Sequence, residues 1–217
     1  MKTFLSIGSG PGIGLATAKR FAAEGYRIIL TSRNQDKLEG LSATLKRKGY
    51  TSETATLDVS DPNAIKALIE GLTGKYGTIE VMHYNAASLR QATIASQPAE
   101  SFASDLAINI AGAMVAVQAV AGPMAKGGEG TILLTGGGFG LAPSPDFISL
   151  SIGKAGLRTL ALGLFDTLKD KGIHIGVVNV AAMVAPDSQT SVNIASEFWA
   201  LHNTSKDKWL AEVTYSE

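Results

Sequence analysis

The sequence contains no cysteine among its 217 residues. A disulfide framework, a thiolate zinc site, a cysteine nucleophile and a cysteine-ligated iron–sulfur cluster are therefore excluded. The three histidines, His83, His174 and His202, lie too far apart along the chain for a local metal-ligand motif. A metal or thiol enzyme of these kinds is thus not expected.

Excess charge of either sign is also lacking, because 19 Lys and Arg residues balance 19 Asp and Glu residues. Nucleic acid and anionic membrane surfaces are disfavoured as partners on this basis. The apolar stretch within residues 1–14 is too short and too rich in glycine for a signal peptide. No stretch is expected to supply the roughly 20 apolar residues of a membrane span. We therefore expect a cytoplasmic protein that does not bind a membrane.

Glycine, by contrast, is abundant, with 24 residues that cluster at 8–14 and 136–140, directly after short apolar runs. Segments with helical spacing of apolar residues separate most of these runs. Such alternation predicts a doubly wound Rossmann fold with a mainly parallel seven-stranded sheet and helices on both faces, in a single domain over 1–217. The expected strands are 3–7, 26–31, 53–57, 79–84, 130–135, 173–180 and 210–215.

Helix boundaries agree with this fold. Asp61 before Pro62 is typical of a helix start, and Gly25, Gly49 and Gly172 each end a helical segment. Two long apolar helices are expected at 98–124 and 147–170. The irregular stretches 141–146 and 182–190 follow expected strands, at the edge where such folds bind ligands.

The first strand leads into Gly8-Ser9-Gly10-Pro11-Gly12-Ile13-Gly14 and then a helix. Glycines let the backbone turn sharply and approach a pyrophosphate, and the helix start offers free N–H groups. Ile13 stands where the G-x-G-x-x-G pattern has its third glycine. The motif predicts dinucleotide binding; the alternative is a glycine-rich turn without a ligand.

The second strand ends in Ser32-Arg33, where an NAD-binding protein would place an acidic residue for the ribose 2′-hydroxyl. A guanidinium and a hydroxyl suit a 2′-phosphate instead. NADP(H) is therefore favoured over NAD(H). The alternative is that Arg33 only caps a solvated helix start.

With these motifs in order, the chain resembles the short-chain dehydrogenase/reductase superfamily over nearly its full length. Asp58-Val59 resembles the family's adenine-contacting pair, and Tyr84–Ala87 resembles its Asn-Asn-Ala-Gly turn. Asn109 falls where the family keeps a helix asparagine, and Lys154 where it keeps the lysine that binds the nicotinamide ribose. The resemblance implies an oxidoreductase acting on a carbonyl or alcohol. The cofactor-binding residues it implies, with the motifs above, are Gly8, Gly10, Gly12, Ile13, Gly14, Ser32, Arg33, Asp58, Val59, Asn85, Ala86, Lys154 and Val184.

Two positions depart from the family pattern. The catalytic tyrosine, four residues before the lysine, is replaced by Leu150, and the catalytic serine falls near Gly137, with Thr135 the only hydroxyl beside it. A longer tyrosine-to-lysine spacing points to Phe147, which has no hydroxyl either. Lys154 and Asn109 remain as the catalytic remnant, so turnover is expected to be weak or absent.

Lys154 also falls on the apolar stripe of its expected helix, where an ammonium needs a polar partner. The ribose hydroxyls are the simplest candidate; the alternative is that the side chain extends past the stripe to solvent. Asn109 similarly interrupts apolar helix positions. It is expected to hold a water or bend the helix, or to be a satisfied buried asparagine with no further role.

The substrate side is shortened, since about six residues separate Val184 from a helix near Ser191; 185–217 then holds this short loop, the last helix and a strand. The usual Pro-Gly after the sixth strand reads Ala181-Ala182. The pocket is therefore expected to be open on one side.

Three functions stay open. The first is an NADP(H)-binding reductase with impaired catalysis, and the second is a reductase that uses another proton source, such as Ser151 or an ordered water. The third is a non-catalytic nucleotide sensor or an inactive partner subunit. A homodimer or homotetramer is expected through the two long helices, whose small residues would permit close approach: Ala111, Gly112, Ala113, Gly153 and Gly156.

Overall fold

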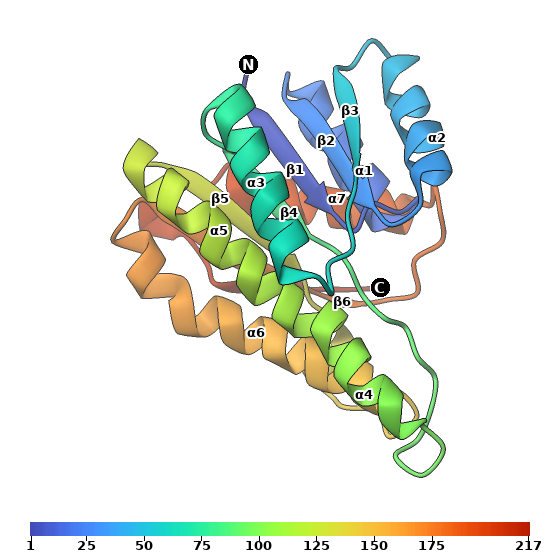
Figure 1. Ribbon diagram of the computed structural model, residues 1–217. Coiled ribbons are helices and arrows are strands. Elements are labelled where there is room, and N and C mark those ends of the chain that lie inside the picture. Colours follow the sequence, from blue (N-terminus) through green and yellow to red (C-terminus); the bar gives the residue numbers. More distant parts are fainter.

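Seven parallel strands form one central sheet in the computed structural model, which describes residues 1–217 (Figure 1). The strands are β1 (Thr3–Ile7), β2 (Arg27–Ser32), β3 (Ser52–Thr56), β4 (Val81–Tyr84), β5 (Gly130–Thr135), β6 (Ile173–Ala181) and β7 (Glu212–Ser216). Their order across the sheet is β3-β2-β1-β4-β5-β6-β7, and every neighbouring pair is parallel. The predicted doubly wound, single-domain fold is confirmed, with a sheet that is wholly rather than mainly parallel.

Helices cover both faces of the sheet, as parallel connections require. One face carries α3 (Pro62–Tyr76), α5 (Gly112–Gly127) and α6 (Ile148–Lys169), packed in an apolar core of 23 buried residues. The other carries α1 (Ile13–Ala23), α2 (Gln35–Lys46) and α7 (Gln189–His202), around a second core of 16. Because both faces are covered, β1 is buried along its whole length.

Successive strands are added on one side of β1 up to β3 and on its other side from β4 onward, so the strand order reverses beside β1, whose neighbours are β2 and β4. In open parallel sheets, ligands bind outside the carboxyl ends of the strands at such a reversal. The glycine-rich loop after β1 and the loop after β4 therefore meet at the edge where a ligand is expected.

The predicted helix boundaries are confirmed. The Asp61 carboxylate accepts hydrogen bonds from the backbone N–H groups of Asn63 and Ala64, and Pro62 opens α3. The glycines that end α1, α2 and α6 each have a positive φ, which other residues adopt only with strain: Gly25, Gly49 and Gly172.

The helix expected at 98–124 is confirmed as one helical run, Ala99–Gly127, which contains a π-helical turn that the sequence did not predict. It begins as α4 (Ala99–Leu106), passes through a π-helical turn, η1 (Ala107–Ala111), and resumes as α5. Asn109 sits in the π turn with its side chain bonded to the segment after β4. A π turn inserts a residue into a helix and is frequent at functional sites.

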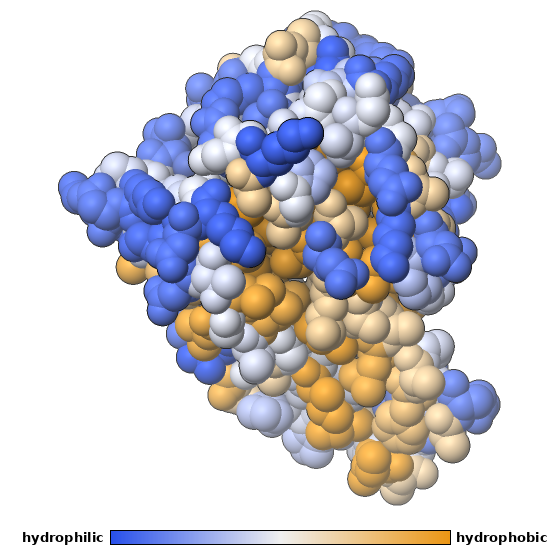
Figure 2. Space-filling view, turned by 60° about the vertical axis from the view of Figure 1, so that its left-hand side comes forward, coloured by the Kyte–Doolittle hydropathy of each residue, from blue (hydrophilic) through white to orange (hydrophobic).

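We expected no stretch long and apolar enough to span a membrane, and this expectation is wrong, because two helices have the required length and composition. The helical run Ala99–Gly127, of 29 residues, and α6, of 22, both meet that test. Alanine and glycine keep these helices apolar although each packs one face against the protein. Figure 2 shows apolar side chains gathered on the lower part of the molecule, where α4 and the adjoining ends of α5 and α6 lie in Figure 1.

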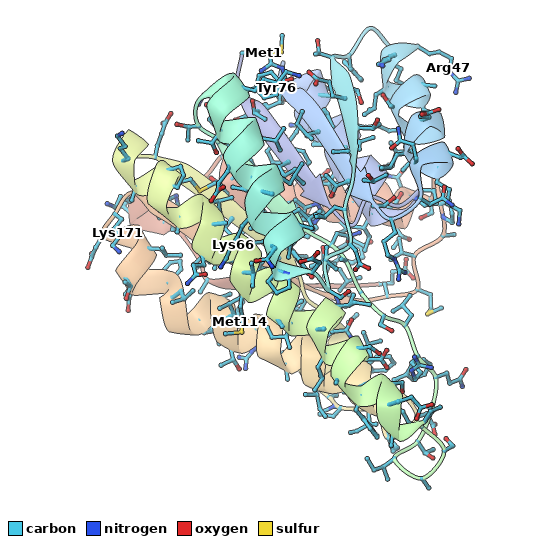
Figure 3. The ribbon with its side chains drawn as sticks, in the orientation of Figure 1. Met1, Arg47, Lys66, Tyr76, Met114 and Lys171 are labelled. Atoms are coloured by element: carbon cyan, nitrogen blue, oxygen red, sulfur yellow. The ribbon has the colours of Figure 1, made fainter.

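Several small residues on these helices pack against other residues of the same chain. A Cβ on Gly112 would lie 2.5 Å from the Val59 carbonyl oxygen, and one on Gly153 would lie 2.3 Å from Asn109 Cβ. The large apolar residues exposed on the two helices include Met114 and Ile152. Figure 3 labels Met114 on α5.

Candidate cofactor site

A cleft of about 260 Å³ opens at the carboxyl edge of the sheet, between the loops that follow β1, β2, β3 and β4. It brings together seven residues predicted from the sequence to bind the cofactor: Gly8, Ser32, Arg33, Asp58, Val59, Asn85 and Ala86. Sequence reasoning missed other lining residues, among them Ser9, Ala87 and Leu89. Ala87 belongs to a motif that was recognised, whereas Leu89 is 76% exposed and left no periodic signal.

The glycine-rich loop is fixed against the loop after β4. Gly8 has φ +84°, and a Cβ there would lie 2.4 Å from the backbone nitrogen of Ala86. The Asn85 side chain donates a hydrogen bond to the Gly8 carbonyl at 2.9 Å. Only glycine permits this close approach, so the two cofactor motifs hold each other in place.

The start of α1 has the properties of an anion site. The backbone N–H groups of Ile13 and Gly14 donate to no group of the chain, and the first turn holds no acidic residue. A Cβ on Gly10 would meet nothing within 4 Å, and one on Gly12 would meet only the Val184 side chain, at 3.9 Å. Free N–H groups beside open space at a helix N-terminus fit a pyrophosphate. The glycine pattern is therefore more than a tight turn.

Arg33 lies exposed at the cleft and forms no hydrogen bond or ion pair with the chain. The start of α2 is capped by Asn34, whose side chain accepts from Lys37 N at 2.9 Å. Hence helix capping does not explain Arg33. Hydrogen bonds from Ser60 hold the pKa of the nearby Asp58 below its usual range, and the charge of Arg33 adds to this effect.

At the other end of the site, Lys154 is buried on α6, with 7% exposure. Its ammonium donates to the Thr135 carbonyl oxygen at 2.6 Å, so the side chain does not extend to solvent. Burial lowers the pKa of Lys154 to about 8. A Cβ on Gly137 would lie 3.3 Å from Lys154 Cγ, and Leu150 lies one turn earlier on the same helix. Neither Gly137 nor Leu150 carries a hydroxyl.

The remaining hydroxyls near Lys154 are engaged elsewhere. Thr135 donates to Asn85 Oδ1 at 2.9 Å, and Ser149 donates to Asp105 at 3.0 Å. Ser151 accepts from the backbone nitrogen of Ser144 at 3.1 Å. The expectation that Ser151 replaces the missing proton donor is therefore not supported, because its side chain holds the 141–147 loop.

His83 is enclosed between the sheet and α7. Its Nε2 lies 2.8 Å from the Thr135 hydroxyl, and its ring packs on Phe198 with centroids 4.5 Å apart. Burial, together with the charge of Lys154, lowers the pKa of His83 to about 3. A neutral, fully buried histidine is a packing residue here and not a proton donor.

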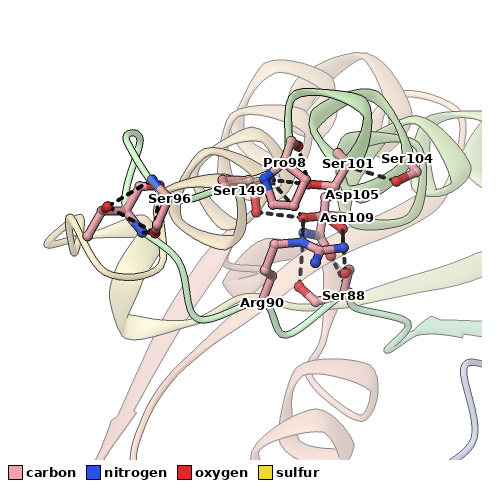
Figure 4. Close-up of polar contacts among 11 residues, drawn as sticks. Ser88, Arg90, Ser96, Pro98, Ser101, Ser104, Asp105, Asn109 and Ser149 are labelled. Atoms are coloured by element: carbon pink, nitrogen blue, oxygen red, sulfur yellow. Dashed lines mark hydrogen bonds and ion pairs between the residues drawn. The ribbon is translucent and has the colours of Figure 1, made fainter.

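A polar cluster connects the segment after β4 with α4 and α6 (Figure 4). The buried Asp105 carboxylate accepts from Ser88 Oγ at 2.7 Å and from Ser149 Oγ at 3.0 Å, and it pairs with Arg90, whose Nε lies 2.7 Å away. Asn109 joins the cluster through the backbone of Ser88. Sequence reasoning found Asn109 but missed Asp105, whose only signal is a carboxylate on the inward face of an apolar helix.

Comparison with known proteins gives consistent matches. The family described as short chain dehydrogenase matches residues 2–196. The oxidoreductase asL5 of Sarocladium schorii is 29% identical over 182 residues, which cover 84% of this chain and 72% of that protein.

Solved structures share the fold. A short-chain dehydrogenase from Rhodopseudomonas palustris superposes with a TM-score of 0.91 and 25% identity, over 100% of this chain and 98% of that one. A metagenomic short-chain oxidoreductase in complex with NADP has a TM-score of 0.91 and 21% identity, over 99% and 96% of the two chains. The sheet order, the glycine loop at the start of α1 and the family match over residues 2–196 agree: this chain belongs to the short-chain dehydrogenase family.

Proposed function

We propose that this chain binds NADP(H) in the cleft and interconverts a carbonyl and an alcohol with slow turnover. Membership of the family supports an oxidoreductase that uses a nicotinamide dinucleotide. The observation that carries the NADP(H) assignment is the free guanidinium of Arg33, which lies at the cleft where an NAD-binding protein would place a carboxylate. The proposed site residues remain those predicted from the sequence.

The dinucleotide matches the cleft together with the start of α1 and Lys154, which lie outside the cleft lining. The free N–H groups of Ile13 and Gly14 would hold the pyrophosphate, and Arg33 with Ser32 would hold the 2′-phosphate. Lys154 has two N–H groups left after its bond to Thr135 and would reach the nicotinamide ribose. When bound, the cofactor supplies or accepts the hydride.

Slow turnover is proposed because Leu150 and Gly137 bear no hydroxyl. A positioned acid or base contributes about 10²- to 10⁴-fold to a rate. A hydrogen-bond donor to the developing oxyanion contributes about 10²- to 10³-fold. A chain that retains the cofactor cleft but lacks these two hydroxyls should still bind the cofactor and should lose most of the rate of carbonyl reduction.

We also propose that a second copy covers the exposed apolar residues of α5 and α6. Met114 is 53% exposed and Ile152 is 49% exposed on neighbouring helices. A homodimer or homotetramer formed there would remove this surface from water. A non-catalytic sensor or inactive partner subunit is the alternative function, which an inert but nucleotide-binding chain would favour.

Nucleotide binding tests the proposal directly. Titration followed by NADPH fluorescence, with NADH in competition, should show at least about tenfold preference for NADPH, since a charge-assisted phosphate contact is worth about 1.5–3 kcal/mol. Arg33→Asp should remove that preference. Arg47→Asp, at the end of α2 and outside the cleft lining, should not (Figure 3). An Arg33→Asp variant with the parent's preference would show that the 2′-phosphate assignment is wrong.

A further inference from the structure

Few side chains near Lys154 carry a proton that is not already donated within the chain. Leu150 and Gly137 offer none, and the hydroxyl hydrogens of Thr135 and Ser149 point to Asn85 and Asp105. Ser151 is turned to Ser144. Lys154 is the exception, because its ammonium carries three N–H groups and only one is used within the chain, at Thr135 O.

Lys154 Nζ lies at the carboxyl end of β5, where it donates to Thr135 O, and the Thr135 hydroxyl donates to Asn85 of the cleft lining. A Cβ on Gly140 would lie 2.8 Å from the Lys154 carbonyl carbon, and one on Gly137 would lie 3.3 Å from Lys154 Cγ. Gly137 and Gly140 therefore pass beside the lysine without a side chain of their own. On the other side, Leu150 lies one turn earlier on the same buried face of α6.

We propose that Lys154 is itself the proton donor to the substrate oxygen in this chain, in place of the absent tyrosine. This inference rests on the proposed function and identifies a catalytic residue for it. When bound, the nicotinamide cofactor would supply the hydride for the new C–H bond at the carbonyl carbon. As the C=O π electrons move onto oxygen, an N–H bond of Lys154 breaks and its proton forms the O–H bond. The products are an alcohol and a neutral amine, and water then reprotonates that amine.

The acidity of Lys154 suits this role. Burial brings its pKa to about 8, so the group is mostly protonated at neutral pH yet releases a proton far more readily than an exposed lysine. A general acid acts best when its pKa lies near the working pH.

Other charged groups on the surrounding elements have partners of their own. On β4, His83 is neutral because its pKa is about 3. Asp105 of α4 pairs with Arg90, and Arg158 of α6 pairs with Glu212 of β7. None forms a hydrogen bond or ion pair with Lys154, and Thr135–Gly140 brings no charged residue.

The first test observes the lysine without turnover. In the nucleotide-free chain, lysine side chains labelled with ¹⁵N and ¹³C are titrated by NMR, and the Lys154 signal is assigned by its loss in Lys154→Arg. One lysine should titrate near pH 8, while exposed lysines titrate near 10.4. A Lys154 signal that titrates with the exposed lysines would overturn the proton-donor role and leave the nucleotide-binding proposal intact.

The second test compares Lys154→Arg with the parent in the reduction of a 1,2-diketone, butane-2,3-dione, by NADPH. Arginine keeps the charge and the N–H donors but releases no proton at working pH. NADPH affinity should stay within about threefold, whereas kcat/KM should fall by about 100-fold. The parent's kcat/KM should decline as pH rises through about 8, and this inflection should vanish in the variant. Lys169→Arg, at the far end of α6, should match the parent.

If the arginine does not fit the buried site, as shown by a loss of cooperative unfolding, Lys154→Met must show the same loss of rate and of inflection. A variant that retains both the rate and the inflection near pH 8 would overturn the proposal, as would a parent that binds NADPH and never reduces the diketone. A parent that does not bind NADPH would overturn the proposed function, and the proton-donor role with it.

Discussion

Asn109 bonds to both backbone polar groups of Ser88. Its Oδ1 accepts from Ser88 N at 2.6 Å, and its Nδ2 donates to Ser88 O at 3.3 Å. The asparagine is 1% exposed and lies in the π turn, so this pair fixes the segment after β4 to the helix beside it. The cofactor motif Asn85-Ala86-Ala87 directly precedes that segment and is positioned by it.

Replacing Asn109 should therefore destabilise the fold. Asn109→Leu keeps the side-chain shape but leaves the N–H and C=O of the half-buried Ser88 without their partners, at about 1–3 kcal/mol each. We expect a loss of about 2–4 kcal/mol in the free energy of unfolding in urea. Asn63→Ala, an exposed asparagine whose side chain bonds to nothing, is the control and should change it by less than about 0.5 kcal/mol. Equal effects of the two substitutions would contradict the proposal that the two Asn109–Ser88 hydrogen bonds stabilise the fold.

Asp105 should make the stability of the fold depend on acid. Burial alone would raise the pKa of this carboxyl, but hydrogen bonds from Arg90, Ser88 and Ser149 outweigh burial and lower it. A lowered pKa in the folded state stabilises the protein above the unfolded value of about 3.9, and this stabilisation is lost as pH falls through the folded pKa.

The prediction is that Asp105→Asn is less stable than the parent at pH 7 and that the difference shrinks below about pH 4. Urea unfolding of both proteins between pH 3 and 7 measures this. Asp170→Asn, at an exposed carboxylate that forms no side-chain bond, should change stability little across the range. A difference between Asp105→Asn and the parent that is the same at pH 3 and pH 7 would refute the assigned role.

Gly8 and Gly25 allow backbone strain to be separated from close packing. Both have φ +84°, but a Cβ on Gly8 would collide with Ala86, whereas one on Gly25 would meet nothing within 4 Å. Gly25→Ala should therefore lose about 1–2 kcal/mol of stability through φ alone. Gly8→Ala should lose more and should weaken NADPH binding at least tenfold, because the two loops must separate. Similar values for both variants would mean that the contact with Ala86 has no role in the site.

Much of the fold could be predicted because its signals are local. The alternation of strands and helices, the Asp61 cap and the glycine-rich loop each depend on residues close together in the sequence. The site was only partly predictable. Asp105 meets Ser88, Arg90 and Ser149 across three separate segments, and no local pattern encodes such a meeting. The direction of Ser151 likewise depends on the fold of the 141–147 loop.

The exposed apolar residues of α5 and α6 should be covered by a second copy in solution. Ile152→Asp places a charge in that surface without entering the cleft, so it should convert the oligomer to a monomer in light scattering coupled to gel filtration. Glu70→Lys, on the exposed side of α3, is the control and should leave the mass unchanged. A parent that is monomeric at high micromolar concentration would disprove the proposed interface.

Restoring the missing hydroxyls should raise the rate. A Cβ at residue 137 would lie 3.3 Å from Lys154 Cγ, in the flexible stem, so Gly137→Ser requires a shift of only a few tenths of an ångström. Combined with Leu150→Tyr, it should raise carbonyl reduction by about 10²-fold or more, because a phenol beside a buried ammonium is a better placed acid. The matched control pairs Gly137→Ser with Leu150→Phe, which adds the same ring without the phenolic hydroxyl, so it should gain only the contribution of the serine and stay well below the tyrosine variant. If the phenylalanine variant gains as much as the tyrosine variant, the gain comes from the serine or from packing, and the absent phenolic hydroxyl does not limit catalysis.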